Sequence, residues 1–184
     1  SDLNFVSGAT ASISGTGLTV GDTTVLSSSL LSVPVTVASG ATTGARSVTV
    51  TNTDGGSSTT TGVFTVTAAP TATSLSPASR GQGAASTTVT ITGTGFQSGA
   101  TVSISGDDVT VGAPSFVSAT SMTVSVAVDA AATIGVRSIT VTNPDGGTAT
   151  TASAFTVTGP PTITSASPSG RGQGAVQATV TVRS

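Results

Sequence analysis

The chain has 184 residues, a length that suits one large domain or two small ones. Five arginines and seven aspartates give a net charge of −2, so the chain lacks the basic surface that nucleic-acid binding requires. Lysine, glutamate, histidine, cysteine, tryptophan and tyrosine do not occur, and no apolar run reaches the roughly 18 residues that a membrane-spanning helix needs.

Short segments in which valine or isoleucine alternates with threonine or serine predict half-buried β-strands. In chain order, the clearest of these segments lie at 87–95, 100–106, 121–128, 137–143 and 154–158. About seven short strands in roughly 90 residues are typical of an immunoglobulin-like (Ig-like) β-sandwich. The bulk of each thin core is expected from the phenylalanines, namely Phe5, Phe64, Phe96, Phe116 and Phe155.

The sequence repeats with a period of 91 residues, and the repeat sets the domain organisation. GARSVTVTNTDGG at 44–56 reappears as GVRSITVTNPDGG at 135–147, and TATSLSPASRGQG at 71–83 reappears as TITSASPSGRGQG at 162–174. Residues 5–67 align with residues 96–158 without a gap and are identical at 34 of 63 positions. We therefore expect three parts: a first Ig-like repeat without its N-terminal strand (1–69), a complete second repeat (70–160) and the N-terminal strand segment of a third (161–184).

Two stretches of the second repeat carry a resemblance to a known family. They read SLSPASRGQGAASTTVTITGTGFQSGATVSISG and ITVTNPDGGTATTASAFTVT, and they resemble the IPT/TIG Ig-like domain. The resemblance covers residues 71–158 fully, and 5–67 and 162–182 in part. It implies tandem Ig-like sandwiches. The abundance of serine, threonine, glycine and alanine is similar to the bacterial surface branch of the family, which implies an extracellular or cell-surface location.

The frame of the repeat suggests a mode of assembly. The first repeat lacks everything equivalent to 71–91, and residues 162–182 have that missing sequence. A sandwich without an edge strand exposes unpaired backbone groups and an apolar groove, which a matching strand from a neighbour can fill. Such a head-to-tail contact need not close, so it can build a filament. The alternative is that the chain is an excerpt of a longer array that contains the missing strand. The candidate intersubunit residues are Phe5, Arg171, Gln173, Val176, Thr179, Val180 and Val182.

We therefore expect a structural subunit of an extracellular filament or surface stalk, whose partners are copies of itself and not nucleic acid. The alternative is an adhesin or a ligand-binding surface module, with a surface or glycan partner that the sequence does not identify. An enzyme is not expected, because a nucleophilic hydrolase needs a base beside its nucleophile and only aspartate is available for that role. No catalytic, cofactor-binding or metal-binding residue is nominated.

The aspartates are expected to have structural roles. Asp107 and Asp108 form the only adjacent acidic pair, and they are interpreted as part of a solvated loop rather than a Ca²⁺ site because the first repeat lacks them. Asp54 and Asp145 lie in NTDGG and NPDGG, where aspartate stabilises a turn.

The arginines also repeat at the 91-residue spacing. Arg46 and Arg137 are expected to be solvated charges at a sheet edge, where they would discourage sideways aggregation. Arg80 and Arg171 lie in a glycine-rich loop before the completing strand, where a role at a junction between repeats is plausible.

Overall fold

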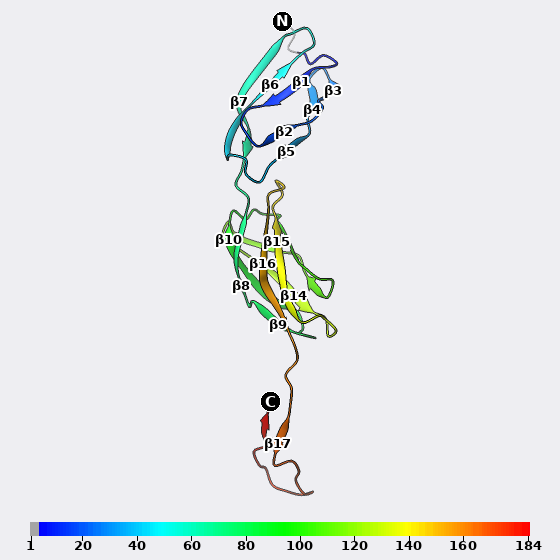
Figure 1. Ribbon diagram of the computed structural model, residues 1–184, viewed down its shortest axis with the longest axis vertical. Coiled ribbons are helices and arrows are strands. Elements are labelled where there is room, and N and C mark those ends of the chain that lie inside the picture. The colour runs from blue at the N-terminus through cyan, green and yellow to red at the C-terminus, as the bar shows by residue number, and fades with distance from the viewer. Residues whose placement is uncertain (1–3) are drawn as a thin grey trace. The chain divides into compact units, whose positions relative to one another are not determined.

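The computed structural model describes residues 4–184, which form β-strands and no helix (Figure 1). The predicted all-β fold is therefore confirmed. The chain divides into two compact units, Ser1–Ala69 and Pro70–Ser184. No helix in the described part of the chain is long and apolar enough to cross a membrane.

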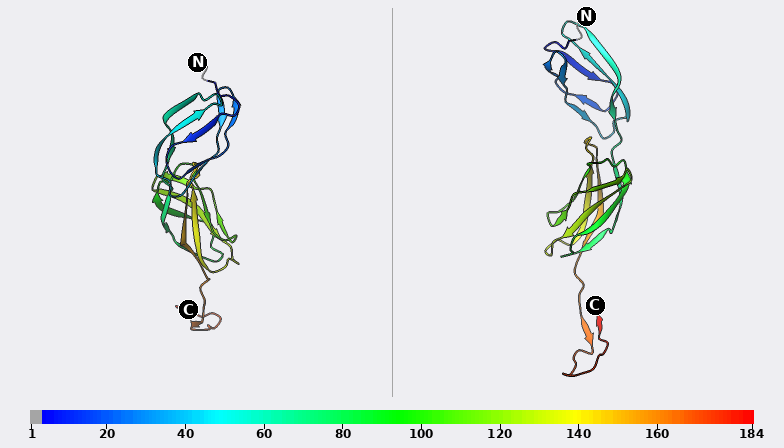
Figure 2. Two further views of the ribbon diagram at one scale, coloured as in Figure 1. Left: turned by 45° about the horizontal axis from the view of Figure 1, so that its top comes forward. Right: turned by 180° about the vertical axis from the view of Figure 1, so that it is seen from behind.

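The second unit contains a complete Ig-like sandwich of two sheets. One sheet has the order β12-β14-β10-β8, with β13 also paired to β14, and the other has the order β11-β15-β16-β9. Figures 1 and 2 show these strands as two layers. Their bounds are β8 Thr71–Ser76, β9 Ser79–Gly81, β10 Thr87–Thr94, β11 Thr101–Ile104, β12 Val109–Val111, β13 Ser115–Ser118, β14 Ser121–Val128, β15 Gly135–Thr142 and β16 Thr148–Thr158.

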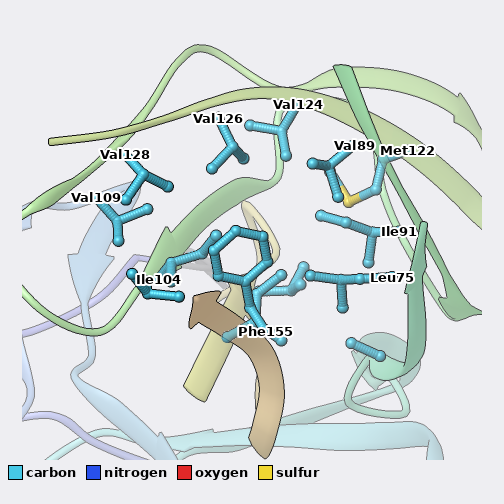
Figure 3. Packing of buried hydrophobic residues seen from close by; sticks show 14 of the residues in the cluster. Leu75, Val89, Ile91, Ile104, Val109, Met122, Val124, Val126, Val128 and Phe155 are labelled. Carbon is cyan, nitrogen blue, oxygen red and sulfur yellow. The ribbon is translucent and has the colours of Figure 1, made fainter. Parts of the chain in front are cut away.

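Alternation along the strands directs one apolar face of each sheet into a shared core. Ile91 of β10 and Val126 of β14 are 0% exposed, as is Phe155 of β16 on the opposite sheet. Figure 3 shows the Phe155 ring among side chains that come from β10, β11 and β14. Phe96 is also buried, at 2% exposed. Phe116 is not part of this core, against expectation: it lies on the short strand β13, which pairs only with β14, and is 40% exposed.

The β15–β16 hairpin turns through Asn143-Pro144-Asp145-Gly146-Gly147. The Asn143 amide donates to the Gly147 carbonyl at 2.8 Å, and the Gly147 amide donates to Asp145 Oδ1 at 3.0 Å. Gly146 has a φ of 86°, a conformation that a side chain disfavours. The first unit repeats this turn, with the Gly56 amide donating to Asp54 Oδ1 at 2.9 Å. The turn roles expected for both aspartates are thus confirmed.

The first unit repeats the second from β11 to β16, with almost every strand displaced by 91 residues. The eight-residue strand β14 corresponds to two short strands, β4 and β5, which are separated by Val33-Pro34. Proline has no N–H for a central ladder, so it accounts for the break. The bounds are β1 Thr10–Ile13, β2 Leu18–Val20, β3 Thr24–Ser27, β4 Leu30–Ser32, β5 Val35–Val37, β6 Gly44–Thr51 and β7 Ser57–Val66.

The sheets of the first unit are smaller than those of the second. One has the order β1-β6-β7, which corresponds to β11-β15-β16, and the others are the pairs β2-β5 and β3-β4. Nothing in residues 4–69 corresponds to β8, β9 or β10.

The last strands of the chain are β17 (Ser165–Ser167) and β18 (Thr181–Arg183), which pair antiparallel with one another (Figure 1). They and the loop between them are called the C-terminal hairpin, residues 162–184. Every residue of this hairpin is exposed.

Candidate functional site

The first candidate surface is an open sheet edge in the first unit. In the second unit, β14 pairs with β12 and β13 along one edge and with β10 along the other. In the first unit, β4 and β5 together correspond to β14. β5 pairs with β2 and β4 pairs with β3, just as β14 pairs with β12 and β13. The edge that β10 would occupy pairs with no strand in the described part of the chain. We call it the open edge, formed by Leu30–Ser32 and Val35–Val37.

The core beside the open edge is only partly covered. Within residues 4–69, the apolar side chains that reach full burial are Ala9 and Val66. Phe64 is half-buried, whereas its counterpart Phe155 is 0% exposed. Val37 is 44% exposed, whereas its counterpart Val128 is 4% exposed. The same contrast separates five further half-buried residues from fully buried counterparts in the second unit: Leu31, Val33, Val35, Val48 and Val50, against Met122, Val124, Val126, Ile139 and Val141.

The second candidate surface is the apolar side of the C-terminal hairpin. Its residues Val180 and Val182 are 47% and 55% exposed. Their counterparts 91 residues earlier, Val89 and Ile91, are both 0% exposed because β10 lies inside the sandwich. The hairpin therefore presents in the open the side chains whose counterparts fill a core.

The seven predicted intersubunit residues lie in two parts of the chain. Phe5 lies in the first unit and is half-buried, whereas its counterpart Phe96 is buried. The other six lie in the exposed C-terminal hairpin: Arg171, Gln173, Val176, Thr179, Val180 and Val182.

The positions within the hairpin are not equivalent. Val180 and Val182 correspond to core residues of β10. Val176 and Thr179 correspond to Ala85 and Thr88, which are exposed in the complete sandwich. By this correspondence, the two valines of β18 lie on the core-facing side and the other two residues on the solvent side.

Arg171 and Gln173 correspond to residues that attach the loop of the complete sandwich. In the second unit, Gln82 Nε2 donates to the Ala132 carbonyl at 2.6 Å, and the Gln82 amide donates to the Thr158 carbonyl at 2.9 Å. Arg171 donates to the Val176 carbonyl at 2.8 Å, just as Arg80 donates to the Ala85 carbonyl at 2.7 Å. The arginine of each loop thus closes its own loop.

Arg137 and Asp108 were expected to be solvated charges, but the structure pairs them and largely covers them. Arg137 forms a salt bridge of 2.9 Å to Asp108, and the two side chains are only 15% and 23% exposed. The Thr133 amide also donates to Asp108 Oδ2, at 2.6 Å. The first unit has Gly17 in place of Asp108, and there Arg46 donates to the Thr42 carbonyl. The pair is a structural clamp specific to the second unit. Sequence spacing alone does not reveal it, because Asp108 lies in the loop before β12 and Arg137 lies on β15.

Sequence reasoning missed two residues. Asn143 is a buried polar residue, 3% exposed, whose Nδ2 donates to the Gly95 carbonyl at 2.7 Å. Its conserved spacing in TN-x-DGG could have drawn attention to it. Ile163 is 74% exposed in the C-terminal hairpin and corresponds to buried Ala72. Alignment at the 91-residue period was the signal that would have found it.

The acidic residues were also compared with the geometry of a metal site. Among residues 4–184, no three of His, Cys, Asp and Glu gather where they could hold an ion.

The chain is similar to one protein family and, in its fold, to solved structures. The model of the IPT/TIG domain matches residues 70–157. No curated protein matches the chain. One of these structures is the Bacteroides ovatus mixed-linkage glucan utilization locus protein SGBP-B in complex with a mixed-linkage heptasaccharide. It is 20% identical, with a TM-score of 0.33, over 87% of this chain and 43% of that one, so this chain spans less than half of its length.

Proposed function

Residues 70–157 are an IPT/TIG domain, and from this premise we propose that the chain is a structural segment of a cell-surface stalk or filament, in which Ig-like repeats join head to tail. One observation carries the proposal. The first unit exposes a half-covered core beside an open edge, and the C-terminal hairpin exposes the apolar residues whose counterparts cover that core in the second unit.

Energetics favour such a contact. Burying apolar surface contributes roughly 25 cal/mol per Å², and an unpaired strand edge offers a row of backbone donors and acceptors to an incoming strand. The surface that receives the strand and the strand itself lie on different parts of the chain, so the contact between copies is heterologous. Such a contact extends as a line when its rotation does not close a ring.

The role is structural and not catalytic. The sequence has no His, Cys, Lys or Glu to act as a base beside its many hydroxyls. A stalk or filament of this kind lies outside the cell, so the proposal also places the chain at the cell surface.

Sedimentation of the full chain over a concentration series tests the proposal, with negative-stain imaging of the same samples. We expect multimers that lengthen with concentration and appear as thin lines. Val180→Thr with Val182→Thr should shift the chain toward the monomer, since it makes the core-facing side of β18 polar. Val176→Thr is the matched control, because Val176 corresponds to an exposed position. A wild-type chain that stays monomeric up to its solubility limit would refute strand exchange between separate chains, and repeats that continue along one longer chain would then be the basis of the stalk.

The second candidate is an adhesin or ligand-binding surface module, and the heptasaccharide held by SGBP-B supplies a probe for it. The chain has no Trp or Tyr on which a sugar could stack, and its most exposed phenylalanine is Phe116, at 40%. Calorimetric titration of the monomeric chain with that heptasaccharide distinguishes the candidates. Saturable binding without multimers would favour the ligand-binding module.

A further inference from the structure

The arginine of the second-unit clamp has a counterpart in the first unit that pairs with no carboxylate within residues 4–184. Arg46 lies on β6 where Arg137 lies on β15, and each guanidinium donates to the carbonyl of the residue four positions earlier. Arg137 also donates to both carboxylate oxygens of Asp108, at 2.9 and 3.3 Å. The counterpart of Asp108 is Gly17, which has no side chain. The first unit therefore repeats the arginine of the clamp without the aspartate.

The backbone around the two arginines is held by equivalent hydrogen bonds. The Ala38 amide donates to the Gly17 carbonyl at 2.8 Å, just as the Asp129 amide donates to the Asp108 carbonyl at 3.0 Å. The adjoining strands keep a further backbone bond of 2.9 Å in each unit, from Ser14 to Ser47 and from Ser105 to Ser138. The anchoring points of the loop are therefore the same in both units.

Two donors hold the Asp108 carboxylate in the second unit, and both recur in the first. The Thr133 amide donates to Asp108 Oδ2 at 2.6 Å, next to the guanidinium of Arg137. The counterpart amide belongs to Thr42, and it has no acceptor among residues 4–184. Arg46 is half-buried, and in the described part of the chain it forms no salt bridge. Because a cation that is partly removed from water without an anion is unfavourable, a carboxylate ligand would stabilise it.

Strands that complete the core leave this position open to solvent. In the second unit, β8, β9 and β10 are all present, yet the Asp108 side chain is 23% exposed and Arg137 bonds to none of those strands. A segment that covered the first unit in the same way would therefore leave Arg46 accessible. Gly15, which contacts the Arg46 guanidinium, and Thr42 are both exposed. The site thus does not depend on what covers the core of the first unit.

We propose that Arg46 and the Thr42 amide bind a carboxylate from outside the first unit, namely an aspartate side chain in an acidic peptide segment of a partner protein. Its oxygens accept from the guanidinium and from the amide, as those of Asp108 do in the second unit. Hydrogen bonds between ionised partners are short and strong, so a single carboxylate is a suitable ligand. This inference is independent of the proposed stalk or filament.

An acidic peptide fits the site better than an acidic sugar. The equivalent position of the second unit holds a peptide aspartate, Asp108, whose carboxylate reaches the arginine through a single methylene group. The loop 15–17 beside Arg46 consists of glycine, threonine and glycine, so it offers no aromatic ring on which a sugar could stack. The ligand is therefore recognised by its carboxylate and by the short arm that carries it.

Titration of the isotope-labelled full chain with a short peptide tests the site by NMR. The peptide has one aspartate between two glycines and is blocked at both ends, and the matched control peptide has asparagine instead. At constant ionic strength, we expect the Thr42 amide and Arg46 Nε signals to shift to saturation, with about tenfold tighter binding of the aspartate peptide. The Thr133 amide should not respond, because Asp108 already accepts from it. Arg46→Gln should abolish the response of Thr42.

Creating the same site in the second unit sharpens the test. Asp108→Gly removes the carboxylate from the second-unit arginine, so the Thr133 amide should then respond to the aspartate peptide as Thr42 does. Asp107→Gly is the matched control, because it removes the adjacent carboxylate and leaves the clamp in place. The wild-type titration still decides the question if the Asp108→Gly chain does not fold.

Four results overturn the proposal. One is a Thr42 amide that does not respond to the aspartate peptide, or that responds equally to both peptides. Another is a wild-type Thr133 amide that responds as strongly as Thr42, since this indicates general charge screening. A third is a folded Asp108→Gly chain in which Thr133 stays unresponsive. The fourth is tighter binding of a methyl glucuronide than of the aspartate peptide, which would make the ligand an acidic sugar.

Discussion

The two units of the chain repeat the same strands 91 residues apart, yet they bury their apolar side chains to different extents. In the second unit, Phe155 and Val126 are 0% exposed. In the first, their counterparts Phe64 and Val35 are half-buried. The difference follows from the strands β8, β9 and β10, which have no counterpart in residues 4–69. A shared sequence thus places the strands, but closing the core requires the segment that covers it.

Truncation of the central phenylalanine is the strongest way to break this comparison. Phe155→Ala should lower the free energy of unfolding of the second unit by about 3–5 kcal/mol, because it removes a fully buried ring. In the monomeric chain, Phe64→Ala should lower the free energy of unfolding of the first unit by less than half as much, because the Phe64 ring is already partly exposed to water. Amide NMR signals followed through a urea titration report each unit separately. Equal losses would mean that the first core is closed in solution.

The hydrogen bonds of the equivalent side-chain amides Asn143 and Asn52 offer a second contrast between the units. Asn143→Ala should destabilise the second unit by about 1–3 kcal/mol, because the Gly95 carbonyl and the Gln97 amide lose their partner in a buried site. Asn52 makes the same two bonds, to the Asn4 carbonyl and the Val6 amide, where solvent has more access. Asn52→Ala should therefore cost less. Thermal melting of each variant by circular dichroism measures the order, and a larger loss for Asn52→Ala would contradict it.

The Arg137–Asp108 clamp sharpens the comparison further. Asp108→Gly should cost the second unit about 1–2 kcal/mol, since Arg137 loses its carboxylate and the Thr133 amide loses its acceptor. The reverse change, Gly17→Asp, should not stabilise the first unit. Gly17 has a φ of +81°, and a Cβ there would lie 2.6 Å from the Ala41 Cα.

Urea midpoints of the two variants check this asymmetry. A stabilised Gly17→Asp variant would show that the loop of the first unit can adopt the conformation of the second. Asp107→Ala is the control, because Asp107 is exposed and the clamp contacts are made by its neighbour Asp108.

Much of the fold was predictable from local pattern. The alternation of valine and isoleucine with threonine predicts the strands, and Asp-Gly-Gly predicts the hairpin turns, because both depend on residues close together in the sequence. The 91-residue period shows which segment of the chain lacks a counterpart. None of these signals needs a long-range contact.

Long-range contacts account for what the sequence could not predict. Asp108 and Arg137 meet only because the loop before β12 comes close to β15 in the folded sandwich. Phe116 looks like a core residue by its type, but its strand lies beside β14 alone and leaves the ring 40% exposed. The match in pairing between β17–β18 and β8–β10 likewise needs the register, which composition does not specify.

The smallest expected effect lies on the three paired strands that both units share, β11-β15-β16 in the second unit and β1-β6-β7 in the first. Thr140 Oγ1 lies 2.9 Å from Thr150 Oγ1, and Thr49 Oγ1 lies 2.7 Å from Thr59 Oγ1, both on exposed faces. Thr140→Val and Thr49→Val should each change the free energy of unfolding by less than about 0.5 kcal/mol, since surface changes that keep a β-branched residue are nearly neutral. The two values should also agree, because these strands pair alike whether or not β8 and β10 are present. If urea titration gives a clearly larger loss for Thr49→Val, the open core of the first unit also weakens the β1-β6-β7 sheet, and the difference between the units extends to the strands that they share.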